Sequence, residues 1–193
     1  MRASAWWPLA AALALAGCGE AAVEAPVANG QAAAAREVGA VNQAATADFP
    51  ALTGRVVDTA EMLSVAEEER LTATLAGLEQ RTSDQLVVVT VPSLGERTIE
   101  AFALALGNHW QIGQRGKDNG VLLVVARDQR TVRIEVGYGL ERILTDARAA
   151  EIIADTMVPK FREADYAGAI VAGADAIVAT LVAQADTPRR GRP

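Results

Sequence analysis

Two runs of apolar, mostly β-branched residues dominate the hydrophobic pattern of the chain. The first covers residues 86–91 and ends at Pro92, and the second covers residues 121–125. Runs of this length, bounded by turn-forming residues, are typical of strands that are buried on both faces. A shorter extended stretch, residues 55–58, precedes them. The pattern predicts a sheet whose central strands are covered on both sides.

Between and after these strands, apolar residues repeat at helical spacing. A helix is predicted to begin at Ser64, because this serine is followed three residues later by a glutamate in the pattern of a capping box. A second helix is predicted over residues 99–110. Two more are predicted, one from about residue 146 to 157, where Pro159 interrupts, and one from about residue 166 to 182.

The second apolar run is followed by a polar turn and then by alternating residues. The turn covers residues 127–130, and over residues 131–136 the valines and isoleucine point one way while Arg133 and Glu135 point the other. Alternation indicates a strand with one solvent-exposed face, and such a strand lies nearer the edge of a sheet. The order of elements therefore predicts an α/β fold: a small, mixed, mostly parallel sheet with helices on both faces and an antiparallel hairpin strand at the edge.

The first 17 residues have the pattern of an export signal. Arg2 precedes an apolar run that is too short to span a bilayer as a mature helix, and small residues end the run at Gly17. Cys18 follows, and residues 15–18 resemble the lipobox of bacterial lipoproteins, in which the cysteine thiol receives a diacylglyceryl group. We predict a signal peptide over residues 1–17 and lipidation of Cys18.

The predicted domain is flanked by segments with too few large apolar residues to form a core. Residues 18–48 are predicted to be the lipidated cysteine and a flexible tether, and residues 184–193 a disordered tail. Residues 49–183 remain as one domain, which we expect on the periplasmic side of the cell envelope. Gly19, where some lipoproteins have aspartate, favours the outer membrane over the inner by resemblance to known lipoproteins.

Composition excludes several classes of function. The chain has 18 Lys and Arg against 24 Asp and Glu, a formal net charge of −6, so nucleic acid is not an expected partner. One His and one Cys exclude a Cys/His zinc site and an internal disulfide. Catalysis by a conventional triad could use only His109, which we interpret as an ordinary helix residue.

Two polar, glycine-rich clusters flank the predicted hairpin. Residues 116–120 come directly before the second buried strand, and residues 137–141 come directly after its hairpin partner. If the turn is centred near residues 128–130, antiparallel pairing sets residue 120 roughly opposite residue 138, and residue 118 opposite residue 140. The two clusters should therefore meet at one end of the sheet, where Asp146, at the start of the next helix, can also reach.

These clusters carry oxygen-bearing side chains that suit Ca²⁺ or Mg²⁺ better than zinc or copper. The candidate ligands are Asp118, Asn119, Glu141 and Asp146. In a metal-assisted reaction, Asp118 would belong to the catalytic centre, and Asp146 or Tyr138 would handle protons. The alternative is structural, since Asp-Asn-Gly is a common turn sequence and Asp146 can simply cap a helix.

Several blocks of the sequence resemble the signature of the TPM domain family, which includes a thylakoid-lumen protein described as an acid phosphatase. The blocks are residues 53–58, 116–124, 133–141, 161–162 and 165–170. The resemblance runs from about Phe49 to Leu181 and implies a Rossmann-like α/β/α sandwich. It also implies bound divalent cations near the aspartates of these loops, and it adds Asp58 as a candidate metal ligand.

The position of Asp58 depends on strand pairing. If residues 55–58 pair parallel to residues 86–91, Asp58 lies at the opposite end of the sheet from Asp118. Only a different pairing would bring both aspartates to one site.

Two functions from different classes remain open, beside a weaker third in which the cation site is purely structural and a cleft binds peptides. The first is a tethered, divalent-cation-binding interaction module that supports the assembly or maintenance of membrane protein complexes. Its partners would be the membrane, through the lipid anchor, and a membrane or periplasmic protein. The second is a metal-assisted acid phosphatase, for which the sequence offers few basic residues near the clusters to hold phosphate.

Overall fold

The computed structural model describes residues 49–186. The predicted signal peptide, Cys18, the tether and most of the predicted tail lie outside the described residues. The described elements follow the predicted order of strands and helices. They are β1 (Val56–Asp58), α2 (Val65–Thr82), β2 (Gln85–Val91), α3 (Ile99–Trp110), β3 (Gly120–Ala126), β4 (Thr131–Val136), α4 (Asp146–Glu151), the π-helix η1 (Ile152–Met157), α5 (Val158–Arg162) and α6 (Tyr166–Ala185).

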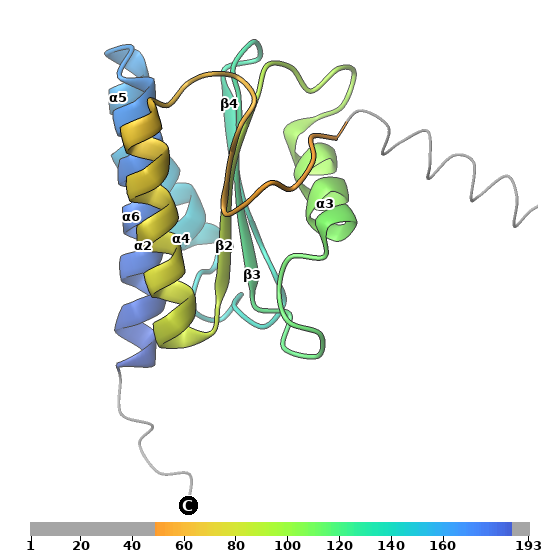
Figure 1. Cartoon of the computed structure of the whole chain (residues 1–193), viewed down its shortest axis with the longest axis vertical. Coiled ribbons are helices and arrows are strands. Elements are labelled where there is room, and N and C mark those ends of the chain that lie inside the picture. The colour runs from red at the N-terminus through yellow and green to blue at the C-terminus, as the bar shows by residue number, and fades with distance from the viewer. Residues whose placement is uncertain (1–48, 187–193) are drawn as a thin grey trace, which may run out of the picture. The chain divides into compact units, whose positions relative to one another are not determined.

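The strands form one mixed sheet in the order β1-β2-β3-β4. β1 and β3 both pair parallel with β2, and β4 pairs antiparallel with β3. Helices α2 and α6 cover one face, and α3 covers the other (Figure 1). The predicted α/β sandwich with a hairpin strand at its edge is therefore confirmed.

The two parallel crossovers have opposite hands. β1, β2 and β3 lie side by side in sequence order and point the same way, yet α2 packs on one face of the sheet and α3 on the other. Both crossovers move to the next strand in the same direction across the sheet, but they pass over opposite faces. They cannot both be right-handed, so one of them departs from the rule that such crossovers are right-handed. The connections that leave β1 and β2 consequently diverge to opposite faces at the carboxyl ends of these strands.

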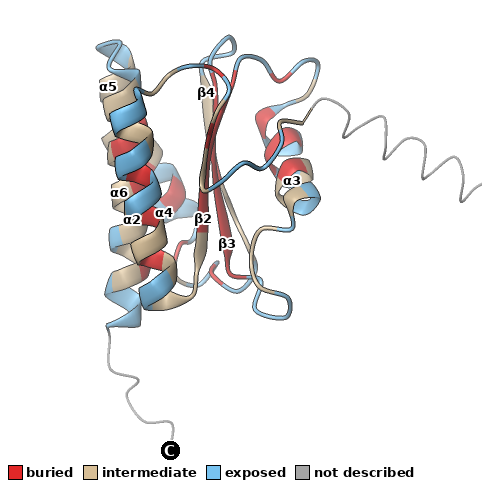
Figure 2. Cartoon of the chain, in the orientation of Figure 1, coloured by how far each residue is buried: buried red, intermediate tan, exposed pale blue. Residues whose placement is uncertain are grey.

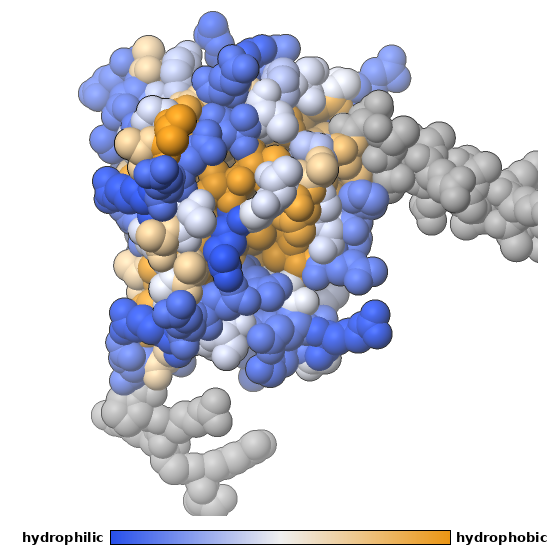
Figure 3. Space-filling view, viewed as in Figure 1, coloured by the Kyte–Doolittle hydropathy of each residue, from blue (hydrophilic) through white to orange (hydrophobic). Residues whose placement is uncertain are grey.

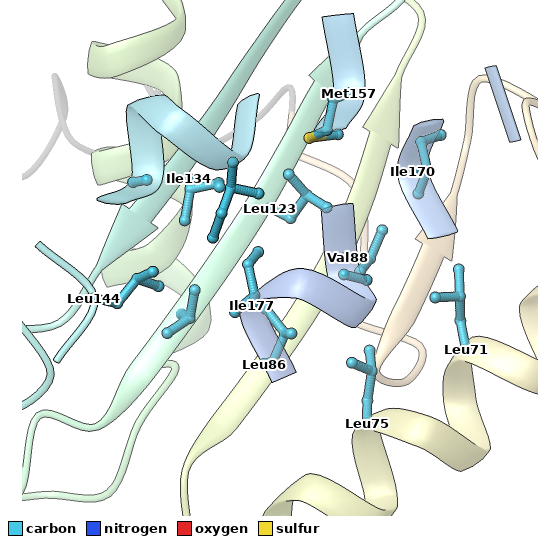
Figure 4. Close-up of a cluster of buried hydrophobic side chains, with 14 of the residues drawn as sticks. Leu71, Leu75, Leu86, Val88, Leu123, Ile134, Leu144, Met157, Ile170 and Ile177 are labelled. Carbon is cyan, nitrogen blue, oxygen red and sulfur yellow. The ribbon is translucent and has the colours of Figure 1, made fainter. Parts of the chain in front are cut away.

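The sheet separates two hydrophobic cores (Figure 2). The larger core lies between the sheet and helices α2, η1 and α6, where residues such as Leu75, Leu123 and Ile177 are completely buried (Figure 4). The smaller core places Phe102 and Leu106 of α3 against the opposite face. Burying one such side chain contributes about 1.5–3 kcal/mol, so the many buried aliphatic residues can offset the small number of aromatics.

The start of α2 has the capping box that the sequence predicts, and a second polar contact lies near the other end of the helix. The Ser64 backbone N–H donates to Glu67 Oε2 at 2.7 Å, and the capping box is complete. Two hydrogen bonds lower the pKa of Glu67, and the one from the Ser64 backbone has a larger effect than the one from the Ser64 hydroxyl. Arg55 ties β1 to α2 by donating to Glu79 over 2.6 Å, and this bond lowers the pKa of Glu79.

The helical segment after the hairpin continues further than predicted. We expected Pro159 to interrupt it, but α4 passes through η1 into α5, which ends at Arg162. Pro159 directly follows the π-helix η1, whose altered hydrogen bonding accommodates a residue without a backbone N–H. Met157, at the end of η1, is fully buried beside Gly173 of α6.

Helix α6 is long and apolar enough to cross a membrane by length and composition alone. In the fold it lies against α2 and the sheet (Figure 1), with Ile170, Ala174, Ile177 and Leu181 buried in the larger core. This burial accounts for its composition. The helix reaches Ala185, which is slightly beyond the predicted end of the domain.

The surface beside the β1 edge is more apolar than its surroundings. Figure 3 shows apolar surface gathered in the centre of the face between α2 and α3. β1 itself is only three residues long, and Leu52, in the chain that leads to it, is 45% exposed. A strand this short offers little free edge for pairing with another chain.

Candidate functional site

The loop before β3 is held in place by Asn119, a buried residue. Its Oδ1 accepts a hydrogen bond from the Gln114 backbone N–H at 2.8 Å. Its Nδ2 donates to the Ser83 carbonyl at 2.7 Å and to Asp84 Oδ1 at 3.3 Å. Asn119 therefore fastens this loop to the end of α2, and its carboxamide is already engaged within the fold.

The two glycine-rich clusters meet at one end of the sheet, as the hairpin predicted. The Gly137 N–H donates to the Gly120 carbonyl at 2.8 Å, and the Gly139 N–H donates to the Asp118 carbonyl at 3.0 Å. Residue 120 thus lies opposite residue 137 and not residue 138, so the predicted register was wrong by one. Ala126 pairs with Thr131, which centres the turn half a residue earlier than we assumed.

Glycines allow the two loops to approach this closely. A Cβ on Gly137 would lie 2.2 Å from the Asp118 carbonyl oxygen, and one on Gly139 would lie 1.9 Å from the Lys117 carbonyl oxygen. Any other residue would force the backbones apart. The close approach fixes the position of Asp118, whose backbone has a left-handed φ of 48°.

A cleft of about 430 Å³ lies where this loop pair meets the end of α3. Its lining residues combine carboxylates, an amide and a phenol with an apolar floor. They are Leu104, Gly107, Asn108, Ile112, Asp118, Gly120, Val121, Leu122, Glu135, Val136, Gly137, Tyr138 and Glu141. Among these described lining residues there is no Lys or Arg, so the cleft has an acidic character.

Sequence reasoning missed two side chains of the cleft, Glu135 and Asn108. Glu135 had been treated only as part of the wet face of β4, but that face borders the cleft opposite α3. It also accepts a hydrogen bond from Arg133 Nε at 3.1 Å, so Arg133 partly balances the acidic charge. The signal available in the sequence was the outward-facing carboxylate two residues before the Gly137 cluster.

Three predicted site residues, Asn119, Asp146 and Asp58, are absent from the lining of this cleft. Asp146 lies exposed in the first turn of α4, where the cap is Thr145, and Asp146 is absent from the cleft lining. A carboxylate in the first turn stabilises a helix, because its negative charge interacts favourably with the positive end of the helix dipole. The position of Asp146 therefore fits a structural role at the start of α4.

Asp58 lies at the other end of the sheet. β1 pairs parallel with β2, so Asp58 sits beside Thr90 at the carboxyl ends of the strands, far from the loop that carries Asp118. Its carboxylate accepts hydrogen bonds from the backbone N–H groups of Met62 at 3.1 Å and Leu63 at 2.8 Å, and from the Thr90 hydroxyl. Asp58 therefore organises the chain between β1 and α2.

The described carboxylates do not form a closed cage for a metal ion. Within residues 49–186, no group of three or more His, Cys, Asp or Glu side chains is placed to hold a metal ion. Asp118 and Glu141 nevertheless line the same cleft. Mg²⁺ is commonly held by one or two carboxylates while water supplies the remaining ligands, and Ca²⁺ also accepts backbone carbonyls and water.

Comparisons with known proteins agree with this architecture. The sequence model of the TPM domain matches residues 56–180. A search among curated proteins gave no match.

The solved structures of similar fold include the following three. The N-terminal domain of a protein from P. gingivalis is 37% identical, with a TM-score of 0.66, and the match covers 72% of this chain and 89% of that domain. The BA42 protein from Bizionia argentinensis is 19% identical, with a TM-score of 0.56 and coverages of 66% and 86%. The N-terminal domain of the cg2496 protein from Corynebacterium glutamicum is 16% identical, with a TM-score of 0.55 and coverages of 76% and 92%. The last two show likeness of fold alone.

Proposed function

Because the chain belongs to the TPM domain family, we propose that it is an envelope lipoprotein whose TPM domain is a divalent-cation-binding interaction module. The domain would face the periplasm and support the assembly or maintenance of membrane protein complexes. The lipobox sequence ending at Cys18 supports the anchor, and Gly19 after it favours the outer membrane. The acidic cleft supports binding of Ca²⁺ or Mg²⁺.

The observation that carries the cation proposal is the set of carboxylates around the cleft. Asp118, Glu135 and Glu141 line it, and the Arg133 side chain engages Glu135. Asp118 and Glu141 have no ion pair in the described part of the chain. Two carboxylates that share a cleft repel one another when it is empty, and a divalent cation between them would remove that repulsion.

A metal-assisted phosphatase is the second candidate. Tyr138 is 81% exposed and lines the cleft together with Asp118, so a phenol stands beside the carboxylates as a possible proton donor. Against this candidate, a phosphate dianion would meet carboxylates and no cationic side chain among the lining residues that the structure describes. Asp146, the other proposed proton carrier, lies outside that lining. The cleft therefore supports the interaction module better.

Ca²⁺ or Mg²⁺ is expected to raise the melting temperature of the protein through mass action. A ligand present at 100 times its dissociation constant stabilises a protein by about 2.7 kcal/mol. Asp118→Asn should abolish most of the shift and leave the metal-free protein folded, because asparagine also tolerates the left-handed backbone of this position. The measurement is the melting temperature of the purified full chain in detergent, with each ion and with a chelator.

Glu69→Gln is the matched control for this experiment. Glu69 is an exposed carboxylate on α2, on the opposite face of the sheet from α3 and the cleft. An ion shift that survives in Asp118→Asn, or none in the wild type, contradicts the cation proposal. Hydrolysis of p-nitrophenyl phosphate that depends on both the ion and Asp118 would instead favour the phosphatase.

Lipidation is tested separately at Cys18. Mass spectrometry of the membrane fraction should find a mature chain that begins at Cys18 and carries acyl groups. Cys18→Ser should move the protein out of the membrane fraction, because serine lacks the thiol that receives the diacylglyceryl group and the chain loses its acyl anchor. A Cys18→Ser chain that still sediments with membranes would disprove the anchor and leave the cation proposal untouched.

A further inference from the structure

A second, smaller pocket lies at the opposite end of the sheet from the acidic cleft. It has a volume of about 90 Å³ and opens beside the carboxyl end of β3 and the hairpin turn. Its walls are mainly apolar, with two arginines and one threonine. The lining residues are Met62, Val125, Ala126, Arg127, Arg130, Thr131, Phe161 and Tyr166.

The pocket lies where the topology favours ligand binding. In open α/β sheets, ligands bind outside the carboxyl ends of the strands, next to the point where connections diverge to opposite faces. The pocket lies at the carboxyl end of β3, and Met62 of the β1–α2 connection forms one wall. The Arg127 guanidinium spans the same edge and donates to the Ala60 carbonyl at 3.2 Å.

The two arginines of this pocket differ in their engagement. Arg127 is held by Ala60 and also pairs with Asp128 at 3.2 Å. The Arg130 guanidinium has neither an ion pair nor a hydrogen bond to any residue that the structure describes, and the residue is exposed. A planar guanidinium with free N–H donors matches the geometry of a carboxylate.

The backbone conformation at Arg130 is one that glycine or asparagine adopts more readily than arginine. Its φ is +52°, in the left-handed region, where glycine and asparagine have a lower conformational cost. An arginine at this turn position therefore adds backbone cost without any stabilising contact to a described residue. A binding role for its side chain accounts for the residue.

The walls of the pocket are mainly apolar and include one threonine. The Thr131 hydroxyl is buried and has no hydrogen-bond partner in the described part of the chain. Val125 and Ala126 are buried, while Phe161 and Tyr166 form an aromatic pair with ring centroids 6.1 Å apart. A phosphate dianion would be poorly solvated among these walls, whereas a carboxylate carries a single charge and can be joined to an apolar group.

We propose that this pocket binds the C-terminal residue of a peptide whose last side chain is small and apolar. The terminal carboxylate would pair with the Arg130 guanidinium, and the side chain would enter the space beside Met62 and Phe161. A C-terminal residue carries its carboxylate and its side chain on one carbon, which suits a pocket of about 90 Å³. An internal Asp or Glu presents only the carboxylate. This proposal does not depend on the cation site.

The test uses the full chain in detergent with a chelator present, and fluorescein-labelled hexapeptides that end in Ala-Val. Fluorescence anisotropy should show saturable binding of the peptide with a free C-terminal carboxylate. Binding of the C-terminal amide, and of an amidated peptide with an internal Glu, should be weaker by on the order of tenfold or more, because the charge-assisted pair is lost. An excess of inorganic phosphate at constant ionic strength should not displace the bound peptide.

Arg130→Asn separates binding from folding. Asparagine removes the guanidinium and relaxes the left-handed backbone, so the variant should bind on the order of tenfold more weakly and melt no lower than the wild type. Arg148→Asn is the control, since Arg148 is an exposed arginine whose contact is Glu151. The proposal is overturned if the amide binds as tightly as the acid, if phosphate competes, or if Arg130→Asn retains full affinity.

Discussion

Replacing Gly139 with alanine is expected to lower the free energy of unfolding by about 3 kcal/mol. The added Cβ would lie 1.9 Å from the Lys117 carbonyl oxygen, and neither backbone can move without breaking the bond from the Gly139 N–H to the Asp118 carbonyl. Gly137→Ala should behave in the same way, since its Cβ would lie 2.2 Å from the Asp118 carbonyl oxygen. Urea unfolding, followed by circular dichroism, measures the change.

Gly77→Ala is the matched control for these substitutions. Gly77 lies within α2, and a Cβ there would meet no atom within 4 Å. Alanine in an open helical position should raise the free energy of unfolding by about 0.5–1 kcal/mol. A Gly139→Ala protein as stable as the wild type would mean that the two loops are further apart than the structure places them.

The cleft should be affected along with stability. Asp118 is positioned by the same backbone contact that Gly139 makes, so a loop displaced by alanine moves a proposed cation ligand. Gly139→Ala is therefore expected to weaken the cation-dependent melting shift, whereas Gly77→Ala should preserve it. The acidic cleft is in this sense a product of close backbone packing as much as of its carboxylates.

Asp58→Ala is expected to lower the free energy of unfolding by about 3 kcal/mol or more, with or without cations. Its carboxylate accepts hydrogen bonds from the N–H groups of Met62 and Leu63 and from the Thr90 hydroxyl. Each polar group left unpaired in a buried position costs about 1–3 kcal/mol. Asp58→Asn should cost less, because one side-chain oxygen remains as an acceptor.

The same experiment separates a structural role of Asp58 from a metal-binding role. If Asp58 were a ligand and nothing more, the alanine variant would be as stable as the wild type without ions and would lose only the ion-dependent increment. Asp155→Ala is a suitable control, because Asp155 is exposed in η1 and its replacement should change stability by no more than about 0.5 kcal/mol.

Arg133 links the charge of the cleft to the edge strand. It lies on the wet face of β4, as the alternation predicts, but it donates to Glu135, which lines the cleft. Removing Arg133 would leave Glu135 unpaired and make the cleft more acidic. Charge on the outer face of an edge strand therefore belongs to the site, a relation that residue spacing alone does not reveal.

The sequence by itself determined the features that depend on local physics. The valine-rich runs predict β2 and β3, Ser64 with its glutamate predicts the start of α2, and the polar turn at residues 127–130 predicts the hairpin that joins the two glycine-rich clusters. Each rests on side-chain periodicity or on hydrogen bonds within a few residues. The sequence leaves the pairing of β1 open, and the parallel pairing with β2 in the structure separates Asp58 from Asp118.

Only the tertiary structure decided how distant segments share surfaces. The face that each crossover helix covers depends on packing of the whole sheet, so the opposite hands of the crossovers could not be read from spacing. The same packing puts Glu135 into the acidic cleft, leaves Asp146 outside its lining and places Met62 beside Arg130. These contacts join residues far apart in the chain, and their geometry is set by backbone approach and burial, which local sequence patterns do not encode.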